Sequence, residues 1–121
     1  MSGRRDDSLV LDDILDAAER LVMLTDDSER PLGRERAVND QVLWNLTVLG
    51  EATKRLGLDV RGRFPDVPWG DMAETRDRIV HHYEGADWAI LESILAEELP
   101  ALLPRLREIR DLLRAEADTG R

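Results

Sequence analysis

The chain has 121 residues, of which 42% are hydrophobic and 36% charged, and its formal net charge at pH 7 is −9. This length suits one domain with one core, while the acidic balance argues against broad, nonspecific nucleic-acid binding, which needs a basic surface. Cysteine is absent, which excludes disulfides, thiolate metal sites and cysteine nucleophiles, and no apolar stretch approaches the ~20 residues that span a bilayer, so we expect a cytoplasmic protein without a membrane partner.

The first predicted helix runs from Leu9 to Leu24, because apolar residues recur there at helical spacing. Ser8 is its expected N-cap. The polar stretch from Asp26 to Arg34 contains proline and glycine and therefore predicts a loop. The residues of the apolar stripe are Leu11, Ile14, Leu15, Ala18, Leu21 and Val22.

A second helix is predicted from about Arg36 to Leu56, with Gly57 as the residue that follows its C-terminus. Gly50 lies inside this helix, where glycine costs roughly 1 kcal/mol relative to alanine. We therefore expect a neighbouring helix to approach closely at Gly50. Residues 58–69 are predicted to be irregular, because Gly62, Pro65 and Pro68 punctuate them.

The third predicted helix is short and runs from about Trp69 or Gly70 to His82, and Asp87 is expected to cap a fourth. The final helical stretch contains Pro100 and Pro104, so a kink or break is expected there. Its apolar positions repeat like a heptad seam, and residues from 115 onward are expected to fray. The seam residues are Leu99, Leu102, Leu106, Ile109 and Leu113.

Together these elements predict an all-α fold, an antiparallel up-and-down bundle of four to five helices. The whole chain, residues 1–121, forms a single domain in this prediction, with a core over about 9–113. There is no internal repeat and no low-complexity segment.

Most of the other conspicuous patterns have ordinary explanations. The stretch from Gly57 to Gly62 has P-loop glycine spacing, but Arg63 and Phe64 replace the Lys and Ser/Thr, and no strand precedes it. Adjacent acidic residues on a helix point about 100° apart, so they form solvated surface and not a shared site. The two histidines, His81 and His82, are adjacent and diverge, so no metal or other cofactor is expected.

The segment from Arg76 to Tyr83 is the one cluster with side chains able to do chemistry. It has a structural interpretation, since cations near a helix C-terminus are favoured by the helix dipole. In the functional interpretation, Arg76 holds a phosphate and His81, a residue type with a pKa near neutrality, moves protons. Five residues on a regular helix separate the two by about 140°, whereas Arg76 and Tyr83 lie within about 20° of each other. Arg76 and His81 can therefore converge on one phosphate only if the helix loosens at its end, or if two copies face each other and bring both clusters into one groove.

The cluster resembles the signature of the HepT-like branch of the HEPN domains, Arg-x4-His-x-Tyr, in the form Arg76-DRIV-His81-His-Tyr83. Further landmarks agree in order and spacing: LGEATKRL, FPDVPW, ADW and LPALLPRL. The resemblance extends from about Leu9 to Leu113. It adds an expected HEPN-like helical fold to the bundle predicted from periodicity.

The resemblance implies a dimeric, metal-independent endoribonuclease, a toxin of a type VII-like toxin–antitoxin pair. Arg76 and His81 would carry RNA cleavage. Tyr83 would be the acceptor of AMP from an MNT-type nucleotidyltransferase antitoxin, which silences the toxin. Adenylylation would place phosphate charge and bulk beside Arg76, in the anion site meant for RNA.

Four basic residues are weaker candidates for contacts to the RNA backbone: Lys54, Arg61, Arg63 and Arg78. The sequence departs from the family pattern at Asp77, where asparagine is common, and at Thr75, where methionine is frequent. The alternative function is a non-catalytic helical module that binds a nucleotide or a partner and works with a nucleotidyltransferase. A purely structural helical adaptor is the third possibility.

Overall fold

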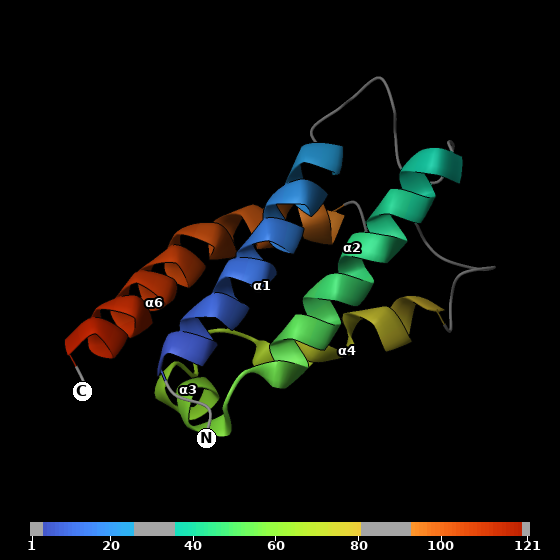
Figure 1. Ribbon diagram of the computed structural model, residues 1–121. Helices are drawn as coiled ribbons and strands as arrows, with labels where there is room; N and C mark the ends of the chain where they lie inside the picture. Colours follow the sequence, from blue (N-terminus) through green and yellow to red (C-terminus); the bar gives the residue numbers. More distant parts are fainter. Residues whose placement is uncertain (1–3, 26–35, 81–92, 120–121) are drawn as a thin grey trace.

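The computed structural model describes residues 4–25, 36–80 and 93–119, and these residues are helical apart from short connections (Figure 1). The α-helices are α1 (Arg4–Thr25), α2 (Arg36–Arg55), α3 (Leu58–Arg63), α4 (Trp69–Val80) and α6 (Leu99–Thr119). A π-helix, η1 (Ile94–Glu98), leads directly into α6. No strand occurs within the described ranges, and the predicted all-α class is confirmed.

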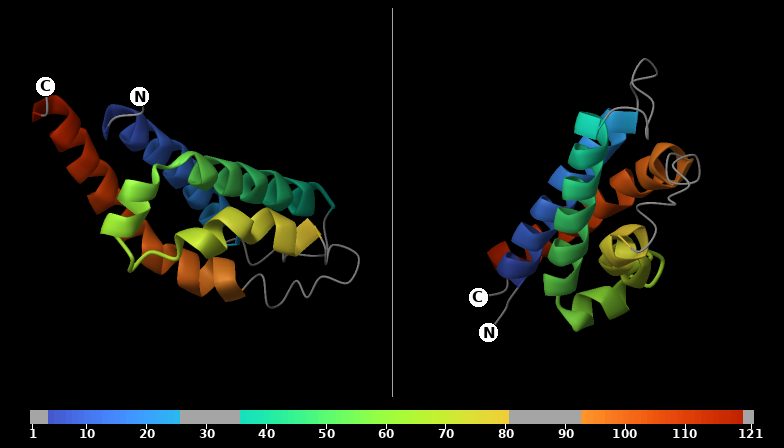
Figure 2. Two further views of the ribbon diagram at one scale, coloured as in Figure 1. Left: turned by 90° about the horizontal axis from the view of Figure 1, so that it is seen from below. Right: turned by 90° about the vertical axis from the view of Figure 1, so that its right-hand side faces the viewer.

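The long helices pack side by side in alternating directions. α1 lies between α2 and α6 and contacts both, and α4 packs against α2. Figures 1 and 2 show α2 and α6 running opposite to α1, and α4 returning along α2. The start of α1 and the end of α6 lie at the same end of the bundle, close to α3. The predicted antiparallel bundle is therefore the observed arrangement.

The predicted apolar stripes form one core. On α1 the stripe residues are buried as expected, apart from Val22, which is partly buried and packs against the core. The apolar stripe predicted for the second helix is buried as well: Val38, Val42, Leu46, Leu49 and Leu56. On α6, Leu103 is buried while Leu102 is only partly buried, so the seam follows helical rather than strict heptad spacing. Burying one such aliphatic side chain is worth about 1.5–3 kcal/mol. The most completely buried large side chains include Leu11, Ile14, Leu21, Leu106, Ile109 and Leu113.

The predicted start of the first helix was wrong. α1 begins at Arg4, and Ser8 lies inside the helix and is buried, so Ser8 is not an N-cap. The acidic residues Asp6 and Asp7 occupy the first turn, where the helix dipole favours negative charge. Asp7 is also buried and accepts a hydrogen bond from the Gly57 backbone N–H at 3.1 Å. This tertiary contact extends the helix beyond the apolar stripe that local periodicity detects.

The expectation that residues 58–69 are irregular was wrong for the first half of that stretch. Residues 58–63 form the short helix α3, with Val60 fully buried as its anchor. Gly57 has φ −60° and ψ 141°, an extended conformation, and it is the N-cap residue of α3. It therefore does not act as a left-handed cap after α2. A helix of six residues with a single buried side chain has no repeating apolar pattern, so periodicity could not predict it.

The final helical stretch continues through both prolines, and the helix is less distorted there than the predicted kink or break. Pro104 lies inside α6, and the helix continues through it. Before Pro100 the helix widens into η1, and the Leu99 N–H donates to the carbonyl of Ile94, five residues back. Proline lacks an N–H and crowds the preceding turn, which accounts for the wider turn at this position. Residues 115–119 are helical, contrary to the predicted fraying, whereas the loop after α1 and the Asp87 cap lie outside the described residues.

Candidate functional site

The motif helix α4 begins at a tightly hydrogen-bonded corner. The carbonyl of Phe64 accepts the Val67 N–H at 3.2 Å and the Trp69 indole Nε1–H at 2.9 Å. The Trp69 backbone N–H donates to the Val67 carbonyl at 2.9 Å, and the Met72 N–H donates to the Pro68 carbonyl at 3.0 Å. Phe64, Val67 and Trp69 are all buried. The FPDVPW segment therefore fixes the start of α4 to the core.

Two arginines enclose the ring of Phe64. The guanidinium carbons of Arg63 and Arg105 lie 5.2 and 5.3 Å from the ring centroid, within cation–π range. Arg63 donates two hydrogen bonds to Glu116, at 2.8 and 2.7 Å, and these bonds raise the pKa of Arg63 above its ordinary value. Arg105 donates to Asp66 at 2.8 Å, which lowers the pKa of the Asp66 carboxyl. Through these pairs the corner is tied to α6.

The middle of α4 lies directly against the backbone of α2 at Gly50. A Cβ atom at Gly50 would lie 3.1 Å from the carbonyl oxygen of Ala73 and 3.6 Å from that of Met72. Gly50 is buried, and Ala73 is 7% exposed. The predicted close approach of a neighbouring helix at Gly50 is confirmed.

Arg76 is in α4, one helical turn after Ala73, and α4 remains α-helical as far as Val80. Asp77 is exposed. His81, His82 and Tyr83 lie outside the described residues, as do the side chains of Arg76 and Arg78. The convergence of Arg76 and His81 on one phosphate therefore stays a prediction.

Three of the four weaker basic candidates, all except Arg78, lie near the first turn of α4, away from the motif. Lys54 is in the last turn of α2, where its Nζ is 3.5 Å from Glu51, and Arg61 and Arg63 are on α3. Since α4 has 12 residues, its two ends are ~18 Å apart. The guanidinium of Arg63 is engaged by Glu116, whereas Arg61 has no ion pair with a described carboxylate.

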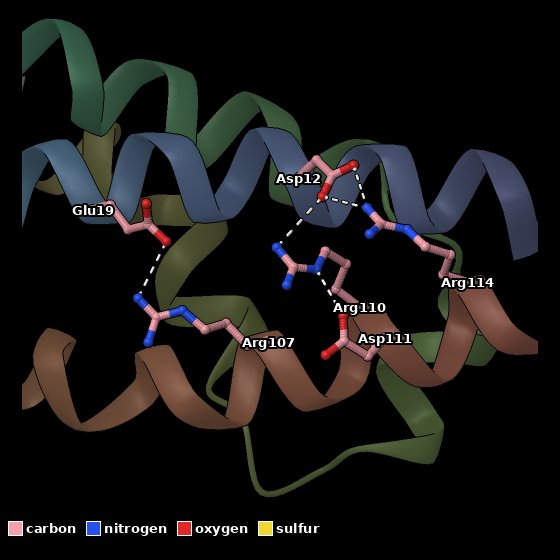
Figure 3. A network of polar contacts seen from close by, with 6 residues as sticks. All are labelled: Asp12, Glu19, Arg107, Arg110, Asp111 and Arg114. Carbon is pink, nitrogen blue, oxygen red and sulfur yellow. Dashed lines mark hydrogen bonds and ion pairs between the residues drawn. The ribbon is translucent and has the colours of Figure 1, made fainter.

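The acidic pair in α1 points in two directions, as predicted. Asp12 accepts hydrogen bonds from Arg114 of α6 at 3.1 and 3.0 Å, and it is 3.7 Å from Arg110 (Figure 3). Asp13 accepts a hydrogen bond from Arg55 of α2 at 2.9 Å. The two neighbours therefore hold α1 against different helices and do not form a shared acidic site.

Sequence reasoning missed an open groove between the last turns of α1 and the first turns of α2. Its most exposed apolar side chains are Met23 and Trp44, which are 73% and 65% exposed. The available signal was the position of Trp44, which lies outside the stripe formed by Val42 and Leu46. The other lining residues are Arg20, Leu24, Asp40, Gln41 and Asn45.

Among the described residues, no group of three histidine, aspartate or glutamate side chains is arranged to hold a metal ion. Within the same ranges, no helix has the length and apolar character needed to cross a membrane.

Comparison with known proteins gives the family. Residues 14–109 match the family model described as Ribonuclease HepT-like, a span that includes α4 and the whole Arg76–Tyr83 motif. The chain belongs to the HepT-like ribonuclease family. Membership places it among RNA endonucleases, and the resemblance stated from the motif is confirmed.

The curated relatives carry names consistent with this family. A protein of Methanocaldococcus jannaschii named “Putative RNase” is 31% identical over 107 residues, 88% of each chain. A second protein of that organism with the same designation is 31% identical over 101 residues, 83% of this chain and 93% of its own. “Probable ribonuclease HepT” of Thermococcus cleftensis is 33% identical over 69 residues, 57% of this chain and 63% of its own. No solved structure gives a significant match.

Proposed function

We propose that this HepT-like chain is a metal-independent endoribonuclease toxin of a type VII-like toxin–antitoxin pair. The observation that carries the proposal is the family match over residues 14–109, a span that contains the complete Arg-x4-His-x-Tyr motif, whose arginine is in α4. RNA is the substrate, and the catalytic groups are Arg76 and His81.

The proposed chemistry uses the nucleophile that RNA itself carries. The ribose 2′-OH attacks the adjacent phosphorus, the bond to the 5′-oxygen breaks, and a 2′,3′-cyclic phosphate and a free 5′-OH result. His81 moves a proton in this reaction as general acid or base. Arg76 holds the phosphate by hydrogen bonds and neutralises the charge that develops in the transition state.

A homodimer supplies the geometry that one regular helix lacks. α4 is α-helical through Val80. If this geometry continued for one more residue, Arg76 and His81 would lie about 140° apart around the helix axis. In a two-fold dimer the motif ends of two α4 helices face one groove, and Arg76 of one copy meets His81 of the other. Light scattering at micromolar concentration tests this assembly; a monomer with full activity would contradict it.

The test of catalysis is cleavage of a labelled RNA by the purified chain with and without EDTA. We expect cleavage in both conditions, and Arg76→Ala is expected to lower the rate by about 10²–10³-fold. Arg114→Ala is the matched control, since Arg114 pairs with Asp12 on the α1–α6 face and its loss leaves α4 untouched. Equal activity of Arg76→Ala and wild type would remove Arg76 from the mechanism, and activity that disappears with EDTA would contradict the metal-independent route.

The proposed partner is an MNT-type nucleotidyltransferase that adds AMP to Tyr83. The phenol oxygen attacks the α-phosphorus of ATP, the bond to pyrophosphate breaks, and the phenol proton passes to a base of the transferase. Tyr83 is the only tyrosine of the chain, so an AMP group attached to a tyrosine can be attached only there. Intact-mass spectrometry after incubation with the transferase, ATP and Mg²⁺ is expected to show AMP-sized increments in wild type and none in Tyr83→Phe.

Modification is also expected to abolish RNA cleavage, while Tyr83→Phe keeps its cleavage in the presence of the transferase. AMP transfer to a chain that never cleaves RNA would instead favour the non-catalytic module that works with a nucleotidyltransferase. Modification that leaves cleavage unchanged would separate Tyr83 from the RNA site.

A further inference from the structure

The contact between α2 and α4 at Gly50 involves backbone atoms on both sides. The atoms that a Cβ at Gly50 would meet first are carbonyl oxygens, those of Ala73 at 3.1 Å and Met72 at 3.6 Å. The hydroxyl oxygen of Thr75 follows at 3.7 Å, and this hydroxyl donates to the Met72 carbonyl at 2.9 Å. A carbonyl in a helix cannot rotate away as the tip of a long side chain can. An added methyl group at Gly50 therefore has to displace α4 itself.

The two carbonyls serve the motif directly. In an α-helix the carbonyl of residue i accepts the N–H of residue i+4. The oxygens of Met72 and Ala73 therefore accept the backbone N–H groups of Arg76 and Asp77. Gly50 thus lies against the turn of α4 that sets the backbone position of Arg76.

The start of α4 has little freedom to absorb a displacement. Trp69 is buried and is hydrogen-bonded to Phe64 through its indole, and its backbone N–H is bonded to Val67. A methyl group at Gly50 that displaces Ala73 therefore tilts the second half of α4, which leads into the motif.

We propose that Gly50 is a positioning residue: its missing side chain sets the distance between α2 and α4 and so places Arg76 for catalysis. This inference rests on the proposed ribonuclease function of Arg76. The role explains why α2 carries a helix-weakening glycine at a buried position, where alanine would otherwise favour the helix.

Gly50→Ala is the test, and Gly70→Ala is its matched control. Gly70 lies in the first turn of α4, and a Cβ there would meet nothing within 4 Å. Both substitutions replace a helical glycine with a better helix former, but only the first adds an atom between α2 and α4. Because misplacement by about 1 Å costs roughly 10²-fold in rate, a shift of a few tenths of an ångström is expected to lower kcat by about tenfold in Gly50→Ala. KM and the melting temperature are expected to stay close to those of wild type, and Gly70→Ala is expected to keep the wild-type kcat.

Amide chemical shifts of the same variants separate this inference from the proposed function. In Gly50→Ala we expect shifts in the amides of residues 73–80 of α4, and in Gly70→Ala no changes beyond the first turn of α4. Such shifts in a chain without ribonuclease activity would show that Gly50 sets the distance between α2 and α4, and would defeat the proposed function together with the catalytic role of that spacing. The positioning role is overturned if α4 amides do not shift, if Gly50→Ala cleaves RNA at the wild-type rate, if both variants lose the same activity, or if Gly50→Ala loses its cooperative fold.

Discussion

Trp69→Phe tests how the corner before the motif helix is held together. The substitution keeps an aromatic ring but removes the indole N–H that donates to the Phe64 carbonyl at 2.9 Å, at a residue only 4% exposed. Losing a buried hydrogen bond typically costs about 1–3 kcal/mol. The Phe64 carbonyl keeps its second donor, the Val67 N–H at 3.2 Å, so the cost falls in the lower half of that range. We expect a loss of about 1–2 kcal/mol, and at roughly 4 °C per kcal/mol a melting temperature lower by about 4–8 °C.

The assay is urea denaturation followed by circular dichroism, since removing a tryptophan alters the fluorescence signal. Trp44→Phe is the matched control, because Trp44 undergoes the same chemical change on α2 while 65% exposed. Its stability is expected to stay within about 0.5 kcal/mol of wild type. Equal destabilisation by the two substitutions would contradict this expectation, because burial and the indole hydrogen bond of Trp69 would then contribute nothing to stability.

Three further outcomes are expected. The hydrogen bond from Arg105 lowers the pKa of Asp66 below its ordinary 3.8, so this pair stabilises the folded state above about pH 4 and the contribution is lost as the pH falls through the lowered pKa. The difference in melting temperature between wild type and Asp66→Asn should therefore shrink from pH 7 to pH 3, and a constant difference would contradict this. His81→Ala should lower RNA cleavage by about 10²–10⁴-fold while His82→Ala costs far less, and equal losses would mean the wrong histidine was chosen. Arg61→Gln should weaken RNA binding and reduce the slope of log affinity against log salt by about 0.7–1, whereas an unchanged slope would exclude a phosphate contact.

Local patterns were sufficient to predict the long helices and most of the core. The stripe of α1 and that of α2 repeat over five or six turns, which is long enough for helical spacing to be distinguished from other periods. The helix α3 escaped detection because six residues with one buried side chain carry no period. The start of α1 was misplaced because Asp7 is stabilised by the distant Gly57 N–H, a contact that no local rule contains.

The candidate site divides in the same way. Residue types and their spacing were enough to identify the family, because the Arg76–Tyr83 motif depends on nothing else. They also marked Gly50 as an anomaly within a helix. The packing of α4 on α2 was needed to show which atoms the glycine faces, namely the carbonyls of Met72 and Ala73. The tertiary structure also shows that Arg63 is held by Glu116, 53 residues away. Spacing along a helix sets which face of the helix a residue occupies. The residue that it contacts on that face comes from a distant segment, and the position of that segment depends on how the whole core packs.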